Sequence, residues 1–219
     1  MTTVIFDLDG TLLDTAPDFS FILDTQLARH GLEPLPYEVV HRTVSSGARA
    51  LVQRAFNIDG DDERLPVLLE EFLAAYAELI PSTRARLFDD IAALLSGIEK
   101  GGHHWAIMTN KARRFSEPLL TQFPDLARYG SLVCPDDVNA AKPDPAGILR
   151  ACSELGIDPA TAVYVGDHPR DIEAAIKAGM PGIAVRWGYL CEEPHIDAWG
   201  AAFIADTPSH LADYLGLTR

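Results

Sequence analysis

Short apolar runs alternate along the chain with segments in which apolar residues recur every three or four positions. The apolar runs predict strands at residues 4–6, 105–108, 131–133, 162–165 and 182–185, with a weaker sixth strand at 203–205. Helical spacing predicts helices within 88–100, 112–123, 145–155 and 169–178. Strands that alternate with helices form βαβ units, so the pattern predicts an α/β fold with a Rossmann-like parallel sheet covered on both faces.

One stretch of the chain, residues 17–80, contains no convincing strand. Helical patterns run through 18–30, 37–43, 47–56 and 64–79, and the last pattern places on one face Leu65, Leu68, Leu69, Phe72, Leu73 and Tyr76. We therefore expect a small all-helical cap domain at 16–81, inserted into a core domain that comprises 1–15 and 82–219, with hinges at 13–17 and 81–86. At the start of the next core helix, we expect Asp89 to be the cap.

Composition and charge narrow the class of protein. The chain has 219 residues, 47% of them apolar and 23% charged, which suits one domain with an inserted lobe or two small domains. Its net charge of −14 argues against nucleic acid and membranes as partners, because both are anionic. No apolar run approaches the roughly 18 to 20 residues that span a bilayer, and no targeting segment is visible, so we expect a cytoplasmic protein.

The three cysteines, Cys134, Cys152 and Cys191, are far apart in the chain and include no C-x-x-C pair. Their odd number and wide spacing argue against a disulfide framework and against a zinc site. We expect reduced thiols in a cytosolic protein.

Polar residues that can handle a phosphoryl group follow the predicted strands. In open parallel sheets, ligands bind outside the carboxyl ends of the strands, so residues directly after the strands converge on one site. The candidates are Asp7 and Asp9 after 4–6, Thr109 and Asn110 after 105–108, Asp167 and Asp171 after 162–165, and Lys142 in the KPDP segment before a helix.

Each acidic or basic candidate has a chemical role in phosphate transfer. A carboxylate such as Asp7 can attack phosphorus and form an aspartyl-phosphate. Asp9 can protonate the leaving alcohol and then take a proton from the attacking water. A hard divalent ion such as Mg²⁺, held by Asp7 and Asp167, would offset the repulsion between the nucleophile and an anionic phosphoester. Lys142 can neutralise the nucleophile and a phosphate oxygen as a point charge.

These motifs and their order resemble the haloacid dehalogenase superfamily of phosphohydrolases. The resemblance covers nearly the whole chain and rests on DLDGT at 7–11, Thr109-Asn110, Lys142 in KPDP, and Gly166-Asp167 with Asp171. It implies that Asp7 is the nucleophile and that Asp9 is the general acid/base, whose backbone carbonyl also reaches Mg²⁺. It further implies that Asp167 completes the metal site and that Asp171 supports this site without touching the metal. The dehalogenase branch lacks the second acid, so the resemblance implies phosphate chemistry.

Within the superfamily, the chain looks like the phosphoglycolate phosphatase branch with a small helical cap. A narrower likeness, to the N-acetylmuramic acid 6-phosphate phosphatase family of bacterial cell-wall recycling, rests on TAPDF at 15–19, SGARA at 46–50, CPDDV at 134–138, VRWGY at 185–189 and WGA at 199–201. The resemblance implies a Mg²⁺-dependent phosphatase, monomeric or homodimeric, that hydrolyses a small phosphorylated metabolite. N-acetylmuramic acid 6-phosphate and 2-phosphoglycolate are the two candidate substrates.

The acidic motifs also have non-catalytic interpretations. Asp7 and Asp9 could open a calcium loop, but Leu12 and Asp18 stand where an EF-hand needs Gly and Glu. The two acids after the strand at 162–165 could serve only as caps of the following helix, because helix N-termini favour acids. The presence of all the motifs together favours the catalytic interpretation.

The remaining polar candidates are less specific. Thr109 and the backbone N–H of Asn110 can bind phosphate oxygens, or the two residues can be plain turn residues. Lys142 would be an ordinary surface lysine outside its motif. Arg49 either reaches the substrate from the cap or is an exposed helix residue.

Three histidines and one aromatic segment have no assigned role. His103 and His104 are neighbours near a strand, where successive side chains point to opposite faces, and no third ligand is evident, so we expect them to be structural or exposed. His168 follows Asp167, and we expect it to be exposed to solvent. Residues 186–189 follow a strand end and either line the rim of the site or pack beneath it.

Two rival functions remain open. A phosphosugar mutase uses the same aspartyl-phosphate but returns the phosphoryl group to a sugar. A non-catalytic binding protein could also use this fold, because a fold alone does not determine function. The complete set of acids argues against the second rival.

Overall fold

The centre of the molecule is a parallel β-sheet, seen in a computed structural model that describes residues 3–190 and 195–217. Its strand order is β5-β4-β1-β6-β7-β8, and every pairing is parallel. The strands are β1 (Thr3–Phe6), β4 (His104–Met108), β5 (Leu132–Val133), β6 (Ala162–Gly166), β7 (Gly182–Val185) and β8 (Phe203–Ala205). The predicted parallel α/β fold is confirmed, including the weaker strand at 203–205.

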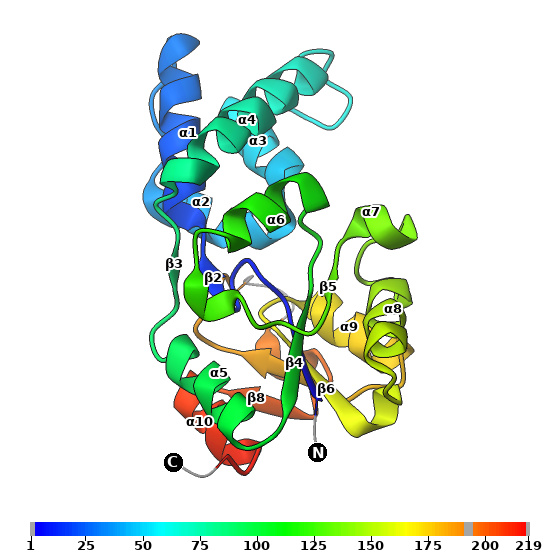
Figure 1. Ribbon diagram of the computed structural model, residues 1–219. Helices are drawn as coiled ribbons and strands as arrows, with labels where there is room; N and C mark the ends of the chain where they lie inside the picture. Colours follow the sequence, from blue (N-terminus) through cyan, green and yellow to red (C-terminus); the bar gives the residue numbers. More distant parts are fainter. Residues whose placement is uncertain (1–2, 191–194, 218–219) are drawn as a thin grey trace.

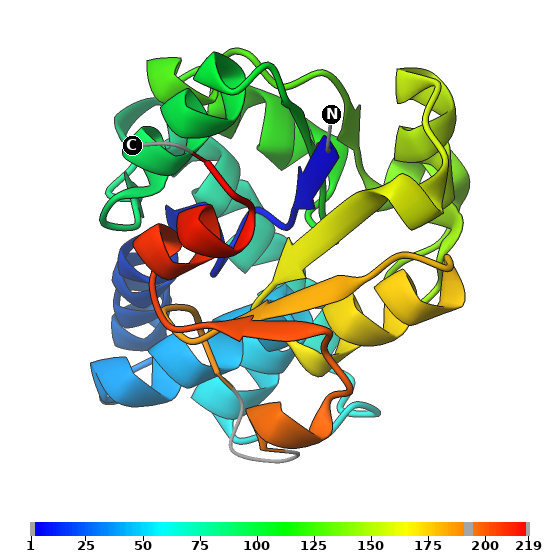
Figure 2. The same cartoon turned by 90° about the horizontal axis from the view of Figure 1, so that it is seen from below.

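Helices cover both faces of this sheet (Figures 1 and 2). One face carries α8 (Ala146–Leu155) and α9 (Pro169–Lys177), and the other carries α5 (Ile91–Lys100) and α10 (Pro208–Tyr214). The remaining elements of this part are α6 (Arg113–Leu120), α7 (Pro135–Val138), η3 (Pro124–Leu126), η4 (Pro159–Thr161) and η5 (Ile196–Ala198). None of the described helices combines the length and the apolar character needed to cross a membrane.

Alternation along the strands explains why both faces need cover. Val4 and Phe6 belong to one buried apolar cluster, whereas Ile5 between them belongs to another. In β4, Ile107 packs on the side of Phe6 and Ala106 on the side of Ile5. Since successive side chains of a strand point to opposite faces, strands that are apolar at every position must be buried on both sides.

A block of helices separates the first core strand from the next one. Between β2 (Leu13–Asp14) and β3 (Arg86–Leu87) the elements are α1 (Ala16–Arg29), α2 (Tyr37–Thr43), η1 (Val44–Ser46), α3 (Ala48–Phe56), α4 (Leu65–Leu79) and η2 (Ile80–Ser82). We call α1 to η2 the helical insert. It lies above the sheet in Figure 1, with α6 packed beneath it. The absence of strands predicted for 17–80 is confirmed.

The two connections to the helical insert are joined to each other. β2 and β3 form a short antiparallel pair, which the sequence pattern did not predict. The hydroxyl of Tyr189 accepts hydrogen bonds from the backbone N–H groups of Thr15 (2.5 Å) and Ala16 (2.9 Å), and it donates to Asp14 Oδ1 (2.8 Å). A side chain that is distant in the sequence therefore holds the start of α1 in place.

The predicted Asp89 cap is wrong. α5 begins at Ile91 and its N-cap is Asp90, which has a left-handed backbone (φ 63°) and no side-chain hydrogen bond to the helix. The reason lies in the preceding strand, because Phe88 N–H donates to the Leu12 carbonyl (3.2 Å) and prolongs the β2–β3 pairing. The turn into the helix consequently starts later than the sequence pattern suggested.

Asp18, in the first turn of α1, links the two connections through its carboxylate. The side chain is fully buried and accepts hydrogen bonds from Thr83 Oγ1 (2.5 Å) and the backbone N–H of Arg84 (2.6 Å). Buried polar groups that lose their partner are costly, so this carboxylate stabilises the junction.

We expect Asp18→Ala to lower the free energy of unfolding by about 1–3 kcal/mol, because two donors at the junction lose their acceptor. Urea denaturation followed by circular dichroism measures the change. Asp24→Ala, an exposed position on the same helix, is the control and should change stability by less than about 0.5 kcal/mol. Equal effects of the two substitutions would contradict a structural role for Asp18.

Candidate active site

The carboxyl ends of β1 and β6, together with the loop between α7 and α8, bring four charged side chains together. Asp7 follows β1, and its backbone N–H donates to the Val165 carbonyl (2.9 Å), so its position is fixed by the sheet. Lys142 Nζ lies 2.8 Å from Asp7 Oδ2 and 2.8 Å from Asp171 Oδ1. Asp167, the fourth member, follows β6 and is fully buried. The four residues form what we call the carboxylate–lysine cluster.

Lys142 is held in place by several neighbours. Its side chain is 0% exposed, and Nζ also donates to the Tyr164 hydroxyl (2.8 Å), which donates in turn to the Met108 carbonyl (2.6 Å). The backbone of Lys142 exchanges two hydrogen bonds with the side-chain amide of Asn110, at 2.8 and 3.2 Å. A buried ammonium group is stable only when it is paired with acceptors or opposite charges. Lys142 is therefore not an ordinary surface lysine.

Asp167 receives hydrogen bonds from three separate segments. The donors are Thr11 Oγ1 (3.3 Å), Ser45 Oγ (2.9 Å) and the backbone N–H of Tyr189 (2.8 Å). Ser45 belongs to η1 of the helical insert, so the insert reaches this carboxylate directly. The close packing extends to Gly10, where a Cβ atom would lie 2.2 Å from Asp167 Oδ2, which leaves room only for glycine.

Asp171 is both a cap of α9 and a partner of Lys142. Its Oδ2 accepts from the backbone N–H of His168 (2.9 Å), which caps α9, while Oδ1 faces Lys142. His168 itself is a half-buried N-cap residue whose ring nitrogen accepts from Arg170 N–H (3.3 Å), so the expected solvent exposure is wrong. Burial, together with the charges of Arg170 and Lys142, lowers the pKa of His168 to about 4.

The carboxylate–lysine cluster has more negative than positive charge. Oxygens of Asp7, Asp167 and Asp171 lie within 4.8 Å of one another, and Lys142 is the cation that contacts two of these acids. With all three acids ionised, the cluster itself would carry two more negative than positive charges, and the nearby Arg170 acts on Asp171 as a further cation. Burial first, then the charges of Asp171 and Asp7, raises the pKa of Asp167 to about 7. An all-oxygen donor set with this charge suits a hard divalent metal ion.

Asp9 lies beside the cluster with a different set of partners. Lys111 Nζ contacts both carboxylate oxygens, at 3.0 and 3.1 Å, and Thr15 Oγ1 donates to Oδ1 (2.7 Å). Burial lowers the pKa of Lys111, but the charge of Asp9 and the Tyr76 hydroxyl outweigh burial and raise this pKa above its ordinary value. Lys111 was not predicted, although it directly follows Thr109-Asn110 in the sequence.

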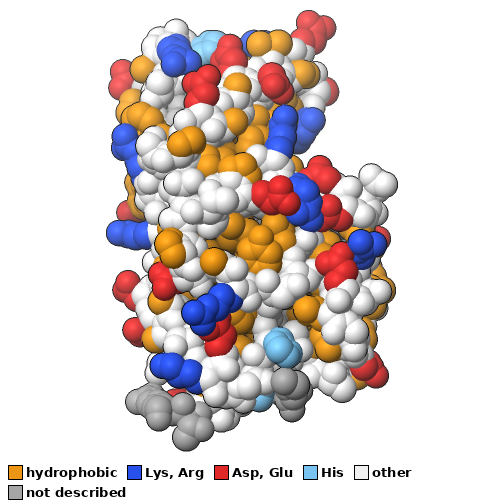
Figure 3. All heavy atoms as spheres, in the orientation of Figure 1, with side chains coloured by type: hydrophobic (Ala, Val, Ile, Leu, Met, Phe, Trp, Pro, Cys, Tyr) orange, Lys and Arg blue, Asp and Glu red, His pale blue; other side chains and the backbone are white. Residues whose placement is uncertain are grey.

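A cavity of about 380 Å³ opens between the helical insert and the carboxyl ends of the strands. On the face shown in Figure 3, apolar side chains gather where the helical insert meets the core that contains the sheet, and charged side chains of both signs surround them. The predicted residues on the cavity wall are Asp7, Asp9, Thr109 and Asn110. The other cluster members, Lys142, Asp167 and Asp171, are buried behind this wall.

Arg49 is the predicted site residue that the structure does not bring to the others. It is exposed on α3, and the cavity wall instead includes Arg170 and Arg114. Arg170 donates to the Ser45 carbonyl and so joins α9 to the helical insert. The sequence motif contained this arginine, next to Asp171, but offered no sign that it faces the cavity.

The residues without an assigned role lie in different parts of the core. Trp187 and Tyr189 pack beneath the site, since Tyr189 is fully buried and Trp187 Nε1 donates to the Thr11 carbonyl (3.0 Å), whereas Arg186 is exposed. His103 and His104 lie at the start of β4, at the opposite end of the sheet from the cluster. Of the cysteines, Cys134 and Cys152 are buried free thiols, and Cys191 lies outside the described residues.

The raised pKa of Asp167 predicts how pH and metal affect stability. Without metal, the folded protein holds this proton more tightly than the unfolded chain, so stability falls as pH rises from about 3.8 to about 7. A divalent cation offsets the repulsion, and we expect Mg²⁺ to raise Tm, relative to EDTA, more near pH 8 than near pH 5.5. Scanning fluorimetry measures the increase in Tm with Mg²⁺ at each of the two pH values.

The control for this prediction is Asp167→Asn, which removes one of the repelling charges. It should raise the metal-free Tm near pH 8 and shrink the gain from Mg²⁺. Equal gains at both pH values, or an unchanged gain in the variant, would contradict metal binding at this cluster.

Comparisons with known proteins agree with this geometry. Residues 4–185 match the haloacid dehalogenase-like hydrolase family. The chain is 45% identical over 215 residues to N-acetylmuramic acid 6-phosphate phosphatase from Pseudomonas aeruginosa, covering 98% of this chain and 95% of the relative. A phosphoglycolate phosphatase from Xanthomonas campestris pv. campestris is 36% identical over 208 residues, covering 95% and 93%.

The solved structures show the same fold. That of a predicted phosphoglycolate phosphatase from Haemophilus somnus aligns with a TM-score of 0.85 at 25% sequence identity, over 98% of both chains. The resemblance stated from the motifs is thus confirmed. The chain belongs to the haloacid dehalogenase-like hydrolase family and is a hydrolase whose near relatives are phosphatases.

Proposed function

We propose that the protein is a Mg²⁺-dependent phosphatase that hydrolyses a small phosphorylated metabolite through an aspartyl-phosphate on Asp7. The observation that carries the proposal is the placement of Asp7 on the cavity wall with Lys142 2.8 Å behind it and Asp167 within the same cluster. In this proposal, 1–15 and 82–219 form the catalytic core domain and 16–81 form the cap domain.

The first step forms the covalent intermediate. Asp7 is oriented by its contacts, since Leu8 N–H donates to Oδ1 (2.8 Å) and Lys142 contacts Oδ2. One carboxylate oxygen bonds to phosphorus as the bond from phosphorus to the leaving oxygen breaks, and Asp9 gives its proton to that oxygen. Thr109 and the backbone N–H of Asn110, both on the cavity wall, hold phosphate oxygens.

The second step releases phosphate. Water attacks the phosphorus of the aspartyl-phosphate, Asp9 takes a proton from this water, and the bond to Asp7 breaks to restore the carboxylate. Side chains of Asp7 and Asp167 and the backbone carbonyl of Asp9 would hold Mg²⁺, while Asp171 fixes Lys142 from behind. When bound, Mg²⁺ supplies positive charge that offsets the repulsion between carboxylate and phosphate.

The size of the cavity favours a sugar phosphate as substrate. A volume of about 380 Å³ lies in the range of roughly 300 to 1,000 Å³ that is usual for small-molecule sites. The two-carbon chain of 2-phosphoglycolate would leave much of this space unfilled, whereas N-acetylmuramic acid 6-phosphate carries a full sugar ring. The 45% identity to a phosphatase named for this sugar supports the same choice.

The helical insert contributes to the reaction by covering the cavity. Val44, Ser45 and Gly47 line it from above, and Ser45 bonds to Asp167. A cap that closes over the substrate excludes water during the first step, which protects the leaving-group proton transfer. A cytoplasmic location fits the buried free thiols Cys134 and Cys152, because reducing compartments keep thiols free.

A phosphate-release assay tests the proposal with N-acetylmuramic acid 6-phosphate, 2-phosphoglycolate and other small phosphoesters, each with Mg²⁺ and with EDTA. We expect Mg²⁺-dependent release, fastest for the sugar phosphate, and its loss in Asp7→Asn. Conversion of a sugar 1-phosphate without net phosphate release would instead identify a mutase. Absence of any turnover would identify a binding protein.

Asp9→Asn separates proton transfer from metal binding. Because an amide cannot shuttle a proton but the backbone carbonyl is unchanged, kcat should fall by about 10²- to 10⁴-fold while Mg²⁺ affinity by calorimetry stays the same. Asp125→Asn, at an exposed position, is the control and should retain the wild-type kcat. Wild-type turnover in Asp9→Asn would remove Asp9 from the mechanism.

A further inference from the structure

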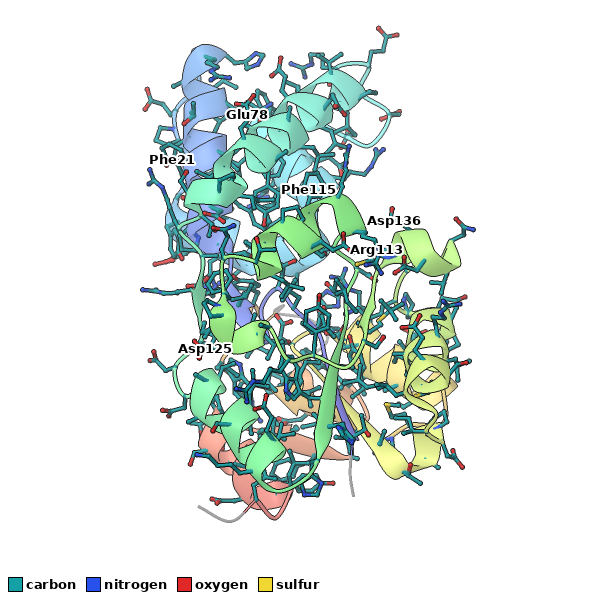
Figure 4. The ribbon with its side chains drawn as sticks, in the orientation of Figure 1. Phe21, Glu78, Arg113, Phe115, Asp125 and Asp136 are labelled. Carbon is teal, nitrogen blue, oxygen red and sulfur yellow. The ribbon has the colours of Figure 1, made fainter. Side chains whose placement is uncertain are left out.

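One side of the cavity is an aromatic wall that the proposed reaction does not use. Phe19 and Tyr76 come from the helical insert and Phe115 from α6, and all three line the cavity. The ring centres of Phe19 and Tyr76 are 4.9 Å apart, and those of Tyr76 and Phe115 are 5.4 Å apart. Figure 4 shows Phe115 between α6 and α4. The wall therefore crosses the boundary between insert and core, and the edges of these largely buried rings give the cavity an apolar side.

The aromatic wall contains a buried hydroxyl group without a partner. Tyr76 is 2% exposed, and its hydroxyl makes no hydrogen bond of good geometry among the described residues, although the charge of Lys111 acts on it. Lys111 Nζ is nearby, but it lies 4.5 Å from the centre of the Tyr76 ring and donates to Asp9. Buried polar groups are nearly always paired, so a hydroxyl left unpaired in a cavity wall indicates a missing ligand atom.

A cation lies at the far end of the same wall. Arg114 lines the cavity, and its guanidinium carbon is 4.6 Å from the centre of the Phe115 ring. No acidic partner is found for Arg114 in the described part of the chain, whereas the adjacent Arg113 pairs with Asp137 and Glu117. Arg113 thus stabilises the fold, whereas Arg114 is an exposed residue at the cavity and is available to pair with an anion there.

A series of contacts leads from the reacting groups to Arg114. Lys111 contacts Asp9 (3.0 Å) and lies over the ring of Tyr76, which packs on Phe115, over which Arg114 lies. Lys111, Tyr76 and Phe115 thus lie between Asp9 and Arg114, so an anion bound at Arg114 would be distinct from the phosphate at Asp7. Lys111 is paired with Asp9, and Arg170, the other arginine of the cavity wall, donates to the Ser45 carbonyl. At this end of the cavity the anion would meet Arg114, and one guanidinium balances a carboxylate better than a phosphate dianion.

We propose that Tyr76, Phe115 and Arg114 form a leaving-group subsite for a sugar ring that bears a carboxylate. Arg114 binds the carboxylate, Phe115 and its neighbours contact the ring, and Tyr76 donates a hydrogen bond to a ring substituent. This subsite rests on the proposed phosphatase function and deepens it by naming the residues that select the substrate. It also distinguishes the two candidate substrates, because the carboxylate of 2-phosphoglycolate is too close to the phosphate to span the aromatic wall.

The test uses two sugar phosphates that differ only in the lactyl ether group that bears the carboxylate. N-acetylmuramic acid 6-phosphate carries a lactyl group that N-acetylglucosamine 6-phosphate lacks. We expect Arg114→Gln to lower kcat/KM for the first substrate by about 10- to 100-fold, chiefly through KM, and to leave the second within about twofold. Tyr76→Phe should lower kcat/KM for both substrates by about 3- to 10-fold. Arg54→Gln, an exposed arginine on α3, is the control and should change neither.

The outcomes separate this inference from the proposed function. Wild-type protein that hydrolyses both sugar phosphates equally well, or an Arg114→Gln variant that keeps the wild-type preference, would overturn the subsite and leave the phosphatase standing. Wild-type protein that releases phosphate from no ester would overturn the proposed function itself. Circular dichroism of each variant confirms that the fold is intact, and Arg114→Lys, which keeps the charge, should recover part of the lost preference.

Discussion

Three buried carboxylates face a single buried lysine at the carboxyl ends of the central strands, and this imbalance of charge governs the rest of the structure. Asp7, Asp167 and Asp171 lie within 4.8 Å of one another, and Lys142 contacts two of them. Such a group is unfavourable in a protein interior unless further positive charge joins it, because buried charges need partners. A divalent cation and a substrate that bridges cation and lysine would complete the balance, which is why the site suits phosphate chemistry.

The surrounding elements hold this group together from several directions. Asn110 fixes the backbone of Lys142, and Tyr164 supports its ammonium from the floor of the sheet. Tyr189 contacts Asp167 through its backbone and the entry to α1 through its hydroxyl, so one residue joins the site to the connection of the helical insert. Ser45 completes the enclosure from above. Substitutions at the junction of the helical insert should therefore also affect the carboxylate–lysine cluster.

The fold and the centre of the site were predictable because their signals are local. Apolar runs marked each strand, and residues directly after strands must meet at one edge of a parallel sheet. The contacts of Ser45 and Tyr189 were not predictable, since they join Asp167 to residues 122 and 22 positions away and depend on tertiary packing. The position of Arg49 was not predictable for a related reason: helical periodicity shows that α3 has two faces but not which one meets the cavity, and this arginine is exposed.

The most direct test of the central claim is whether Asp7 accepts a phosphoryl group in the presence of a divalent cation. Beryllofluoride imitates that group by bonding to a carboxylate oxygen, and fluorine NMR reports its complex with the protein. We expect a one-to-one complex that forms with Mg²⁺, is absent with EDTA and is absent in Asp7→Asn. A complex that forms equally well without Mg²⁺, or that persists in Asp7→Asn, would contradict a metal-assisted nucleophile at Asp7.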